Sequence, residues 1–271
     1  MYKSVVFGKG GISAKVVADS ISKDGIRITT MELNYHRYIH GELLTHRMFS
    51  RNAASSRAIP VRKMIEQVKL NPATPIHWGK NQSGMQAFEE LESGASSWES
   101  AGEVATLYAE DMMDMGYHKQ ITNRLLEPFQ FMKAVVTATE WSNFFELRIH
   151  RDAQPEIQEL AKCIKQAQDE SEPDLLDTDM WHTPYVDIND FIKEDQNFTI
   201  SVCVKCSVAR CARVSYLTHD KALPLVEDDL RLYRMLCERP YDDGNGHILG
   251  EDAPLHLSPL EHQATPMIQA N

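Results

Sequence analysis

Hydrophobic and polar residues alternate in two runs near the start of the chain, over residues 14–20 and 26–33. Such alternation is typical of half-buried β-strands, and the Ser-Lys-Asp-Gly segment between the runs favours a turn. A third run, residues 131–140, has a β-branched and apolar centre, which indicates a buried strand. The pattern predicts a β-hairpin that begins a sheet, and a further strand later in the chain.

Other segments have apolar residues every three or four positions, which is the spacing of one face of an α-helix. Asn34 suits the cap of the first such helix, Pro60 the first turn of the second and Gly116 the end of the third. The predicted helices cover residues 36–49, 61–70, 97–115, 118–128 and 226–240, a short stretch after Trp141, and a stretch that begins at Pro155.

Two segments between these helices are predicted to be irregular. Residues 50–59 are rich in serine, asparagine and alanine, and residues 71–84 are rich in proline, glycine and asparagine. A long irregular loop in a compact domain is often functional, so residues 71–84 are a candidate lid or cofactor-facing segment. An ordinary loop that is anchored by its own side chains is the alternative.

The composition narrows the function classes. With 271 residues, 42% hydrophobic residues and 25% charged residues, the chain is predicted to be a globular protein with a sizeable core. The formal net charge of −11 argues against nucleic acid as a partner, because duplex binding needs a basic face. No apolar run approaches the roughly 20 residues that span a bilayer, and no signal-peptide layout is present. A cytoplasmic protein that does not bind membranes is expected.

The chemistry-bearing side chains give little support for a metal or disulfide site. Five cysteines, of which Cys203 and Cys206 form a C-x-x-C pair, are expected to be reduced thiols, and no zinc-ribbon spacing follows. His36 and His40 would be one helical turn apart, but no acidic third ligand lies at a suitable spacing. No metal is therefore predicted.

The segment from Glu42 to Pro60 has the composition of an anion-binding site. Arginine forks match phosphate oxygens, and serine hydroxyls and loop N–H groups can complete the contact. No carboxylate follows Glu42 in this segment of an otherwise acidic chain, which contains Arg47, Ser50, Arg51, Asn52, Ser55, Ser56 and Arg57. Solvated charges around a helix end are the alternative interpretation.

The order of these residues resembles the signature of the flavin-dependent thymidylate synthases, which reads Arg-His-Arg, seven residues, Ser. Here His46 and Arg47 are followed by seven residues and Ser55, with Thr45 in place of the first arginine. Later segments are also similar to that family and come in its order: Gly116 to Arg124 resembles its Gly-x7-Arg segment, NFFELR its N-x3-L-R pattern, and AQPEIQ its A-Q-x-E-I-R/Q pattern.

The resemblance implies an α+β fold with a central mixed β-sheet flanked by helices, here with a helical C-terminal extension. It divides the chain into a core, residues 1–172, and an extension packed on it, residues 173–271. It implies a methyltransferase that moves a one-carbon group from methylenetetrahydrofolate to C5 of dUMP, giving dTMP. FAD would be the cofactor and NADPH the co-substrate. The family builds its sites between subunits of a homotetramer, so a homotetramer is expected.

The resemblance also assigns roles to individual residues. Arg148 and Ser55 would be catalytic, with Arg148 stabilising the enolate-like charge on the pyrimidine. The substrate would be bound by Glu42, Ser55, Arg57, Arg124 and Arg148. The flavin would lie against His46, Arg47, Ser50, Asn52 and Asn143. By spacing alone, Arg148 follows an apolar run and is either directed into a pocket or exposed at a helix end.

Departures from the family pattern leave alternatives open. Glu42 stands where the family usually has a glutamine that contacts the nucleotide, and a carboxylate only accepts hydrogen bonds. A cytosine-type base, which offers an amino donor, is therefore an alternative to uracil, as dCMP or in a hydroxymethylating variant. A non-catalytic nucleotide- or flavin-binding protein is a further alternative. Arg210 and Arg213 either supplement the site or pair with nearby carboxylates.

Overall fold

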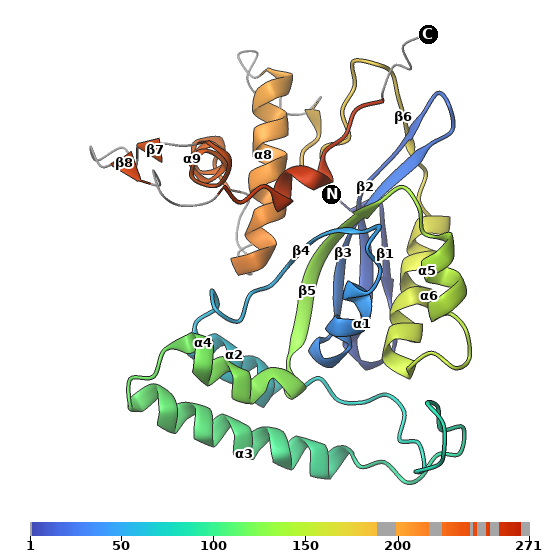
Figure 1. Cartoon of the computed structure of the whole chain (residues 1–271), viewed down its shortest axis with the longest axis vertical. Helices are drawn as coiled ribbons and strands as arrows, with labels where there is room; N and C mark the ends of the chain where they lie inside the picture. Colours follow the sequence, from blue (N-terminus) through green and yellow to red (C-terminus); the bar gives the residue numbers. More distant parts are fainter. Residues whose placement is uncertain are drawn as a thin grey trace.

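The computed structural model describes residues 2–188, 199–216, 224–238, 241–242, 248–249 and 255–266. Its centre is a mixed sheet with the strand order β1-β2-β3-β5-β4, and β6 pairs with β2 beyond the end of β1 (Figure 1). All neighbouring strands are antiparallel except β2 and β6, which are parallel. The strands are β1 (Ser4–Phe7), β2 (Ser13–Ser22), β3 (Arg27–His36), β4 (Ser50–Ala53), β5 (Phe131–Ala138) and β6 (Asp174–Leu176). The predicted α+β fold with a mixed sheet is confirmed.

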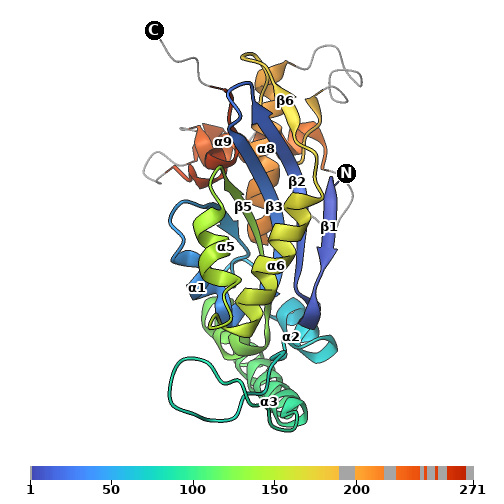
Figure 2. The ribbon, with the colours of Figure 1, turned by 90° about the vertical axis from the view of Figure 1, so that its right-hand side faces the viewer.

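Two helices cover one face of this sheet, which we call the helix face. Figure 2 shows α5 (Ser142–Arg148) and α6 (Pro155–Asp169) in front of the strands. The apolar stripe of α6, Ile157, Leu160 and Ile164, is fully buried in the main core. This burial supplies most of the stability of an amphipathic helix. The short helix α1 (His40–Leu44) contributes Leu43 to the same core.

The opposite face, which we call the polar face, is covered by the C-terminal part of the chain. Here α8 (Ile200–Arg213) lies behind the strands in Figure 2, and its Cys211, together with Val214 just after it, packs against Val135 of β5. Beside it lie α9 (Val226–Cys237) and the 3-10 turns η4 (Val214–Tyr216) and η5 (Ser258–His262). A separate two-stranded pair, β7 (Tyr241–Asp242) and β8 (Ile248–Leu249), completes the described C-terminal elements.

The remaining helices form a layer at one end of the sheet, at the bottom of Figure 1. Its members are α2 (Val61–Leu70), α3 (Ala95–Asp114), α4 (Lys119–Thr122) and η3 (Asn123–Phe129). The helices that the sequence predicted at residues 61–70 and 97–115 are confirmed, and Gly116 ends α3 with a φ of 83°. The segment before Pro128 is a short helix followed by a 3-10 turn rather than one helix. None of the helices in the described part of the chain is long and apolar enough to cross a membrane.

The predictions for residues 36–49 and 50–53 were wrong, whereas residues 54–59 are irregular as predicted. The chain stays extended until His36, because β3 pairs with β5 up to the partners His36 and Phe131. Asn34 is therefore a strand residue, and its side chain donates to the Gly11 carbonyl instead of capping a helix. The 3-10 turn η2 (Arg37–Ile39) and the five-residue α1 replace the expected long helix, and residues 50–53 form a strand instead of a loop.

A chain of buried hydrogen bonds ties the C-terminal part to the polar face. The His182 ring lies between the hydroxyls of Ser20 and Thr30, at 2.8 Å from each. Thr30 continues to Thr137 at 2.6 Å, and Thr137 to Nδ1 of His262 at 2.7 Å. Burial lowers the pKa of His182 to about 3 and that of His262 to about 4. Both rings are therefore neutral near pH 7.

Acidification should destabilise the fold through these two histidines. In the unfolded chain each has an ordinary pKa of about 6.5. As the pH falls below that value, the unfolded chain binds protons that the folded protein does not, so the free energy of unfolding decreases until the folded-state pKa is reached. Urea denaturation at a series of pH values measures this slope, and His262→Gln should make it shallower.

The matched control is His150→Gln, which removes an exposed histidine in the turn after α5. Its slope should equal that of the wild type. If His262→Gln left the slope unchanged as well, His262 would not be a neutral, buried member of the network.

Candidate functional site

Arg148 ends α5 and points toward α1. Its Nε donates to Nε2 of His46 at 2.9 Å, and its Nη1 donates to Oε2 of Glu42 at 3.0 Å. Its Nη2 donates to Oγ1 of Thr45 at 3.1 Å. The side chain is 20% exposed. Of the two alternatives left by the sequence, the arginine directed inward is the one that the structure shows, and it brings Arg148 together with Glu42 and His46.

The groups around Arg148 have perturbed acidities. Burial lowers the pKa of His46, and the positive charges of Arg148 and Arg51 lower it further. The ring must be neutral with its lone pair on Nε2, because Nε2 accepts from Arg148. Burial raises the pKa of Glu42, although Arg148 opposes the shift. This corner therefore contains a held guanidinium, a neutral imidazole and a carboxyl group whose charge is less favoured than in water.

Arg51 has a structural role. Its Nη1 donates to the carbonyls of Leu44 at 3.1 Å and His46 at 2.9 Å, just past the end of α1. A helix end leaves its last carbonyls without partners, and an arginine is a suitable donor for them. Arg51 thus fixes the segment that carries Glu42 and His46.

The loop after β4 is fixed by its backbone. Asn123 is fully buried, and its Nδ2 donates to the carbonyls of Ser56 at 2.7 Å and Ile59 at 3.0 Å. From the other side, the Ser55 N–H donates to the Ser215 carbonyl at 3.0 Å. Arg57 projects from this loop and is exposed, with no hydrogen bond or ion pair to any described residue. The loop therefore presents, on a fixed backbone, a guanidinium that no described residue binds.

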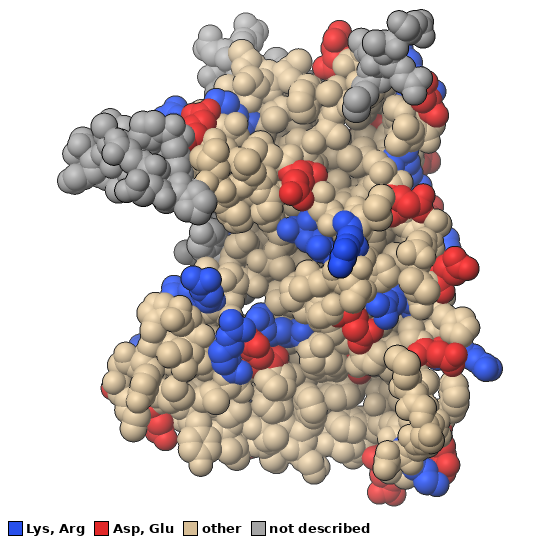
Figure 3. Space-filling model, viewed as in Figure 1, with Lys and Arg blue, Asp and Glu red and all other residues tan. Residues whose placement is uncertain are grey.

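Arg124 lies beside this loop. It follows Asn123 directly, and its Nη1 pairs with Oε1 of Glu127 at 2.8 Å. The same oxygen lies 3.5 Å from the Ser56 hydroxyl. These contacts place the loop with Ser55 and Arg57 next to the segment that carries Arg124, in the region above α4 where Figure 3 shows Lys and Arg side chains gathered; we call Ser55, Arg57 and Arg124 the basic cluster.

The expected flavin contacts lie in several places within one chain. Asn52 is buried toward the polar face, where Ser258 Oγ donates to its Oδ1 at 2.8 Å. Side chains alternate along a strand, so Ser50 faces the same way as Asn52, whereas Arg51 faces α1. Arg47 and Asn143 are exposed and make no hydrogen bond with a described residue. In a single chain, Ser50 and Asn52 are thus separated by β4 from Arg148 and His46.

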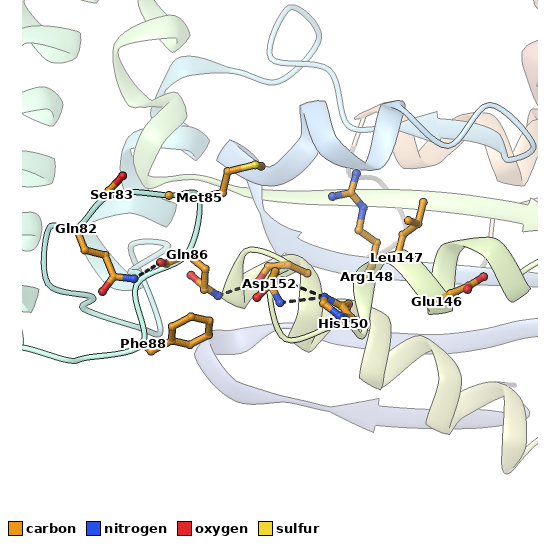
Figure 4. Close-up of a pocket in the computed structure, with 12 residues that line it drawn as sticks. Gln82, Ser83, Met85, Gln86, Phe88, Glu146, Leu147, Arg148, His150 and Asp152 are labelled. Atoms are coloured by element: carbon orange, nitrogen blue, oxygen red, sulfur yellow. Dashed lines mark hydrogen bonds and ion pairs between the residues drawn. The ribbon is translucent and has the colours of Figure 1, made fainter.

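A hollow of about 790 Å³ lies beside Arg148. Figure 4 shows the loop with Gln82, Met85 and Phe88 on one side and the end of α5 with His150 and Asp152 on the other. The loop tip is held by Gln86, whose Nε2 donates to the Ala153 carbonyl at 2.9 Å. The irregular segment predicted at residues 71–84 thus extends further and lines a cavity. Within it, His77 is a loop anchor, since its ring bonds the Ala87 carbonyl at 2.7 Å.

Arg210 and Arg213 form a separate ion-pair cluster. Both guanidiniums bond the carboxylate of Asp229, which is fully buried between α8 and α9, at 2.8 and 2.9 Å. Of the two alternatives from the sequence, the structure therefore shows pairing with a carboxylate. The nearby thiols are buried and free, and burial raises the pKa of Cys206 to about 12. No group of three His, Cys, Asp or Glu side chains suited to a metal occurs among the residues described.

Several contacts at these clusters had no signal in the sequence. Arg37, which pairs with Glu127 at 2.7 Å, lies outside every motif, and Asn123, which holds the loop, is one of the unspecified positions of the Gly-x7-Arg segment. Ser215 and Ser258 come from distant parts of the chain. Such partners are set by tertiary structure, and only a contact prediction between distant segments could have found them.

Most of the candidate site residues lie in a part of the chain that matches a known protein family. A sequence model of the family described as thymidylate synthase complementing protein matches residues 27–173, a range that contains both the Arg148 corner and the basic cluster. A search of curated proteins found no match. The family match supports a thymidylate synthase-like function. Because it covers more than half of the 271 residues, the chain belongs to the thymidylate synthase complementing protein family, which comprises the flavin-dependent thymidylate synthases.

Proposed function

We propose that the protein transfers a one-carbon group from methylenetetrahydrofolate to C5 of dUMP, giving dTMP, with FAD as cofactor and NADPH as co-substrate. The observation that carries the proposal is the held guanidinium of Arg148 beside a cavity, in a chain of this family. A fixed cation in a half-buried corner is suited to stabilise the negative charge that develops on a pyrimidine carbonyl. We propose that the enzyme acts in the cytoplasm, where its five free thiols stay reduced.

The basic cluster supports the nucleotide part of the proposal. A monophosphate carries a double negative charge at neutral pH and needs several donors at fixed positions. Arg57 is exposed and unpaired among the described residues, Ser55 lies on a fixed backbone, and Arg124 stands beside them. In this proposal, Ser55, Arg57 and Arg124 hold the phosphate, while Arg148 and Glu42 meet the base.

The donors of the chain fit a flavin dinucleotide. Among the described residues, the guanidinium of Arg47 has no partner and could bind a phosphate, and the buried amide Nδ2 of Asn52 has no acceptor. His46, Ser50 and Asn143 complete the proposed contacts. When bound, the flavin supplies the hydride that reduces the transferred carbon. Because Ser50 and Asn52 lie across β4 from His46 within one chain, we propose that two subunits share one flavin.

Glu42 favours a second candidate substrate, dCMP. Its Oε2 is bound by Arg148, and its Oε1 has no hydrogen-bond partner among the described residues. An ionised carboxylate accepts from the amino group of cytosine but repels the carbonyl of uracil. However, burial raises the pKa of Glu42, and a protonated carboxyl group can donate to that carbonyl. The ion pair with Arg148 opposes this shift, so the family match, rather than the charge of Glu42, keeps dUMP as the first proposal.

Turnover experiments separate these candidates. The purified protein should carry a flavin absorption spectrum and release tritium from C5-labelled dUMP when folate and NADPH are present. Release from labelled dCMP alone would replace the first candidate with the second, and analysis of the product would reveal a hydroxymethylated base. Nucleotide binding without any tritium release would indicate the non-catalytic alternative.

Arg148→Ala should abolish tritium release and leave the flavin bound, because the proposed partner of Arg148 is the base. The control is Arg62→Ala, which removes an exposed arginine on α2 and should retain full activity. Wild-type turnover by Arg148→Ala would disprove the role assigned to this residue.

Ser55→Ala combined with Arg57→Ala should raise the dissociation constant of the nucleotide by more than tenfold, or about 1.4 kcal/mol. The reason is the loss of a free guanidinium and a hydroxyl from the proposed phosphate site. Calorimetric titration with dUMP measures the change. A smaller effect would mean that the phosphate binds elsewhere.

A homotetramer is also proposed. Its support is a row of exposed apolar side chains on α3, in which Leu107 is 58% and Tyr108 62% exposed. Such surfaces commonly mark protein contacts. Sedimentation analysis should give a mass near four chains, and Leu107→Glu with Tyr108→Glu should lower it, while Glu99→Gln on the same helix should not. A monomeric wild-type protein would rule out the proposal.

A further inference from the structure

Three donors from separate elements converge on one carboxylate oxygen. Oε1 of Glu127 accepts from Nη2 of Arg37 at 2.7 Å and from Nη1 of Arg124 at 2.8 Å. The hydroxyl of Ser56 lies 3.5 Å from the same oxygen. Arg37 comes from η2, Arg124 from η3, and Ser56 from the loop after β4. A single anionic oxygen therefore already occupies the point at which these three donors meet.

This point belongs to the same region as Arg57. Asn123, which precedes Arg124, holds the backbone on both sides of Arg57 through the Ser56 and Ile59 carbonyls. Lys119 Nζ donates to the Ala58 carbonyl at 2.9 Å, which adds another positive charge to the loop. The loop, η2 and η3 thus carry Arg57, Arg37 and Arg124 in one region, in which Glu127 pairs with Arg37 and Arg124.

The guanidiniums of Arg37 and Arg124 keep donors for a ligand. Each guanidinium has five N–H groups, and Glu127 takes one from each. The side chain of Arg37 is only 16% exposed, so its charge is less screened by water than that of Arg124, which is 57% exposed. His40, whose pKa is lowered to about 4 mainly by burial, remains neutral nearby and does not add to the charge.

We propose that Arg37 is a third guanidinium of the phosphate site, beside Arg57 and Arg124, and that Glu127 holds Arg37 and Arg124 together when no phosphate is bound. This inference rests on the proposed function, because it assumes a nucleotide phosphate at the basic cluster. The negative charge of Glu127 offsets the repulsion between the two guanidiniums and holds them close together. The site is therefore formed before the ligand binds. The cost is electrostatic repulsion between Glu127 and the incoming phosphate.

The test compares dUMP with deoxyuridine, which has the same base and sugar but no phosphate. Arg37→Ala should weaken dUMP binding at least tenfold and leave deoxyuridine binding within twofold of the wild type. Arg37→Lys keeps the charge but loses the fork, and should weaken dUMP binding by an intermediate factor. Glu127→Gln keeps an acceptor oxygen and removes the repulsion, so it should tighten dUMP binding severalfold.

An exposed ion pair between α2 and α3 supplies the controls. Lys69 and Glu110 are 2.7 Å apart, and both Lys69→Ala and Glu110→Gln should leave dUMP binding unchanged. Thermal unfolding of each variant identifies any loss of fold, and should Arg37→Ala fail to fold, Arg37→Lys and Glu127→Gln decide the question.

The outcomes separate this inference from the proposed function. If the Ser55 and Arg57 double variant weakens dUMP binding while the Arg37 variants bind like the wild type, only the role of Arg37 is overturned. Equal losses for dUMP and deoxyuridine would also overturn it, because they would show a general effect on the pocket. If the wild type binds dCMP in place of dUMP, the same comparison is made between dCMP and deoxycytidine. A wild type that binds neither nucleotide would overturn the proposed function together with this inference.

Discussion

The antiparallel pairing of β4 with β5 is the interaction on which the site depends. It is only four residues long, from Ser50 opposite Thr137 to Ala53 opposite Ala134, and the Ala54 N–H extends it to the Lys133 carbonyl at 2.8 Å. Because side chains alternate along a strand, it sends Arg51 to the end of α1 and Asn52 to the polar face. The same pairing positions the loop after β4 so that Asn123 can bind the Ser56 and Ile59 carbonyls. A slip of one residue would exchange the faces of Arg51 and Asn52. Arg51 would then lose its bonds to the end of α1, and Asn52 its bond to Ser258.

The polar face explains why so short a strand can be held in place. A sheet face that carries Thr30, Glu32 and Thr137 cannot be covered by apolar side chains alone, since buried polar groups without partners are costly. The C-terminal part supplies the partners: His182 for Thr30, His262 for Thr137, and the Tyr185 hydroxyl, which donates to Glu32 at 3.1 Å. Tyr185 adopts a φ of 64° to do so, an unusual conformation for a bulky residue. Covering this face also brings Ser258 to Asn52 and Ser215 to Ser55.

Features that depend on neighbouring residues in the sequence were predicted, and features that depend on distant segments were not. The β2–β3 hairpin, α2, α3 and α6 depend on periodicity, turns and proline or glycine positions within a few residues, and all were predicted. The strand β4 and the shortened α1 were missed because their conformations are set by pairing with β5, more than seventy residues away. The family resemblance assigned roles to Arg148, Arg57 and Arg124, and these stay predictions. It gave no sign that Asp229 pairs with Arg210 or that Glu127 joins Arg37 to Arg124, because these partners come from segments outside its motifs.

The two arginine sites solve a common electrostatic problem in different ways. In a chain with a net charge of −11, an unliganded cluster of guanidiniums needs carboxylates to stay in place, and Glu42 and Glu127 provide them. Arg148 makes four hydrogen bonds to Glu42, Thr45 and His46, including a long one of 3.5 Å from Nη2 to the Glu42 carbonyl. They use Nε, one N–H of Nη1 and both of Nη2, so one N–H of Nη1 remains available. A carbonyl can therefore bind Arg148 without displacing Glu42, which would otherwise be left half-buried and without its partner. Under the proposed function, this geometry suits a neutral acceptor at Arg148 and the charged phosphate at Arg57 and Arg124, and it implies the orientation in which the nucleotide would lie.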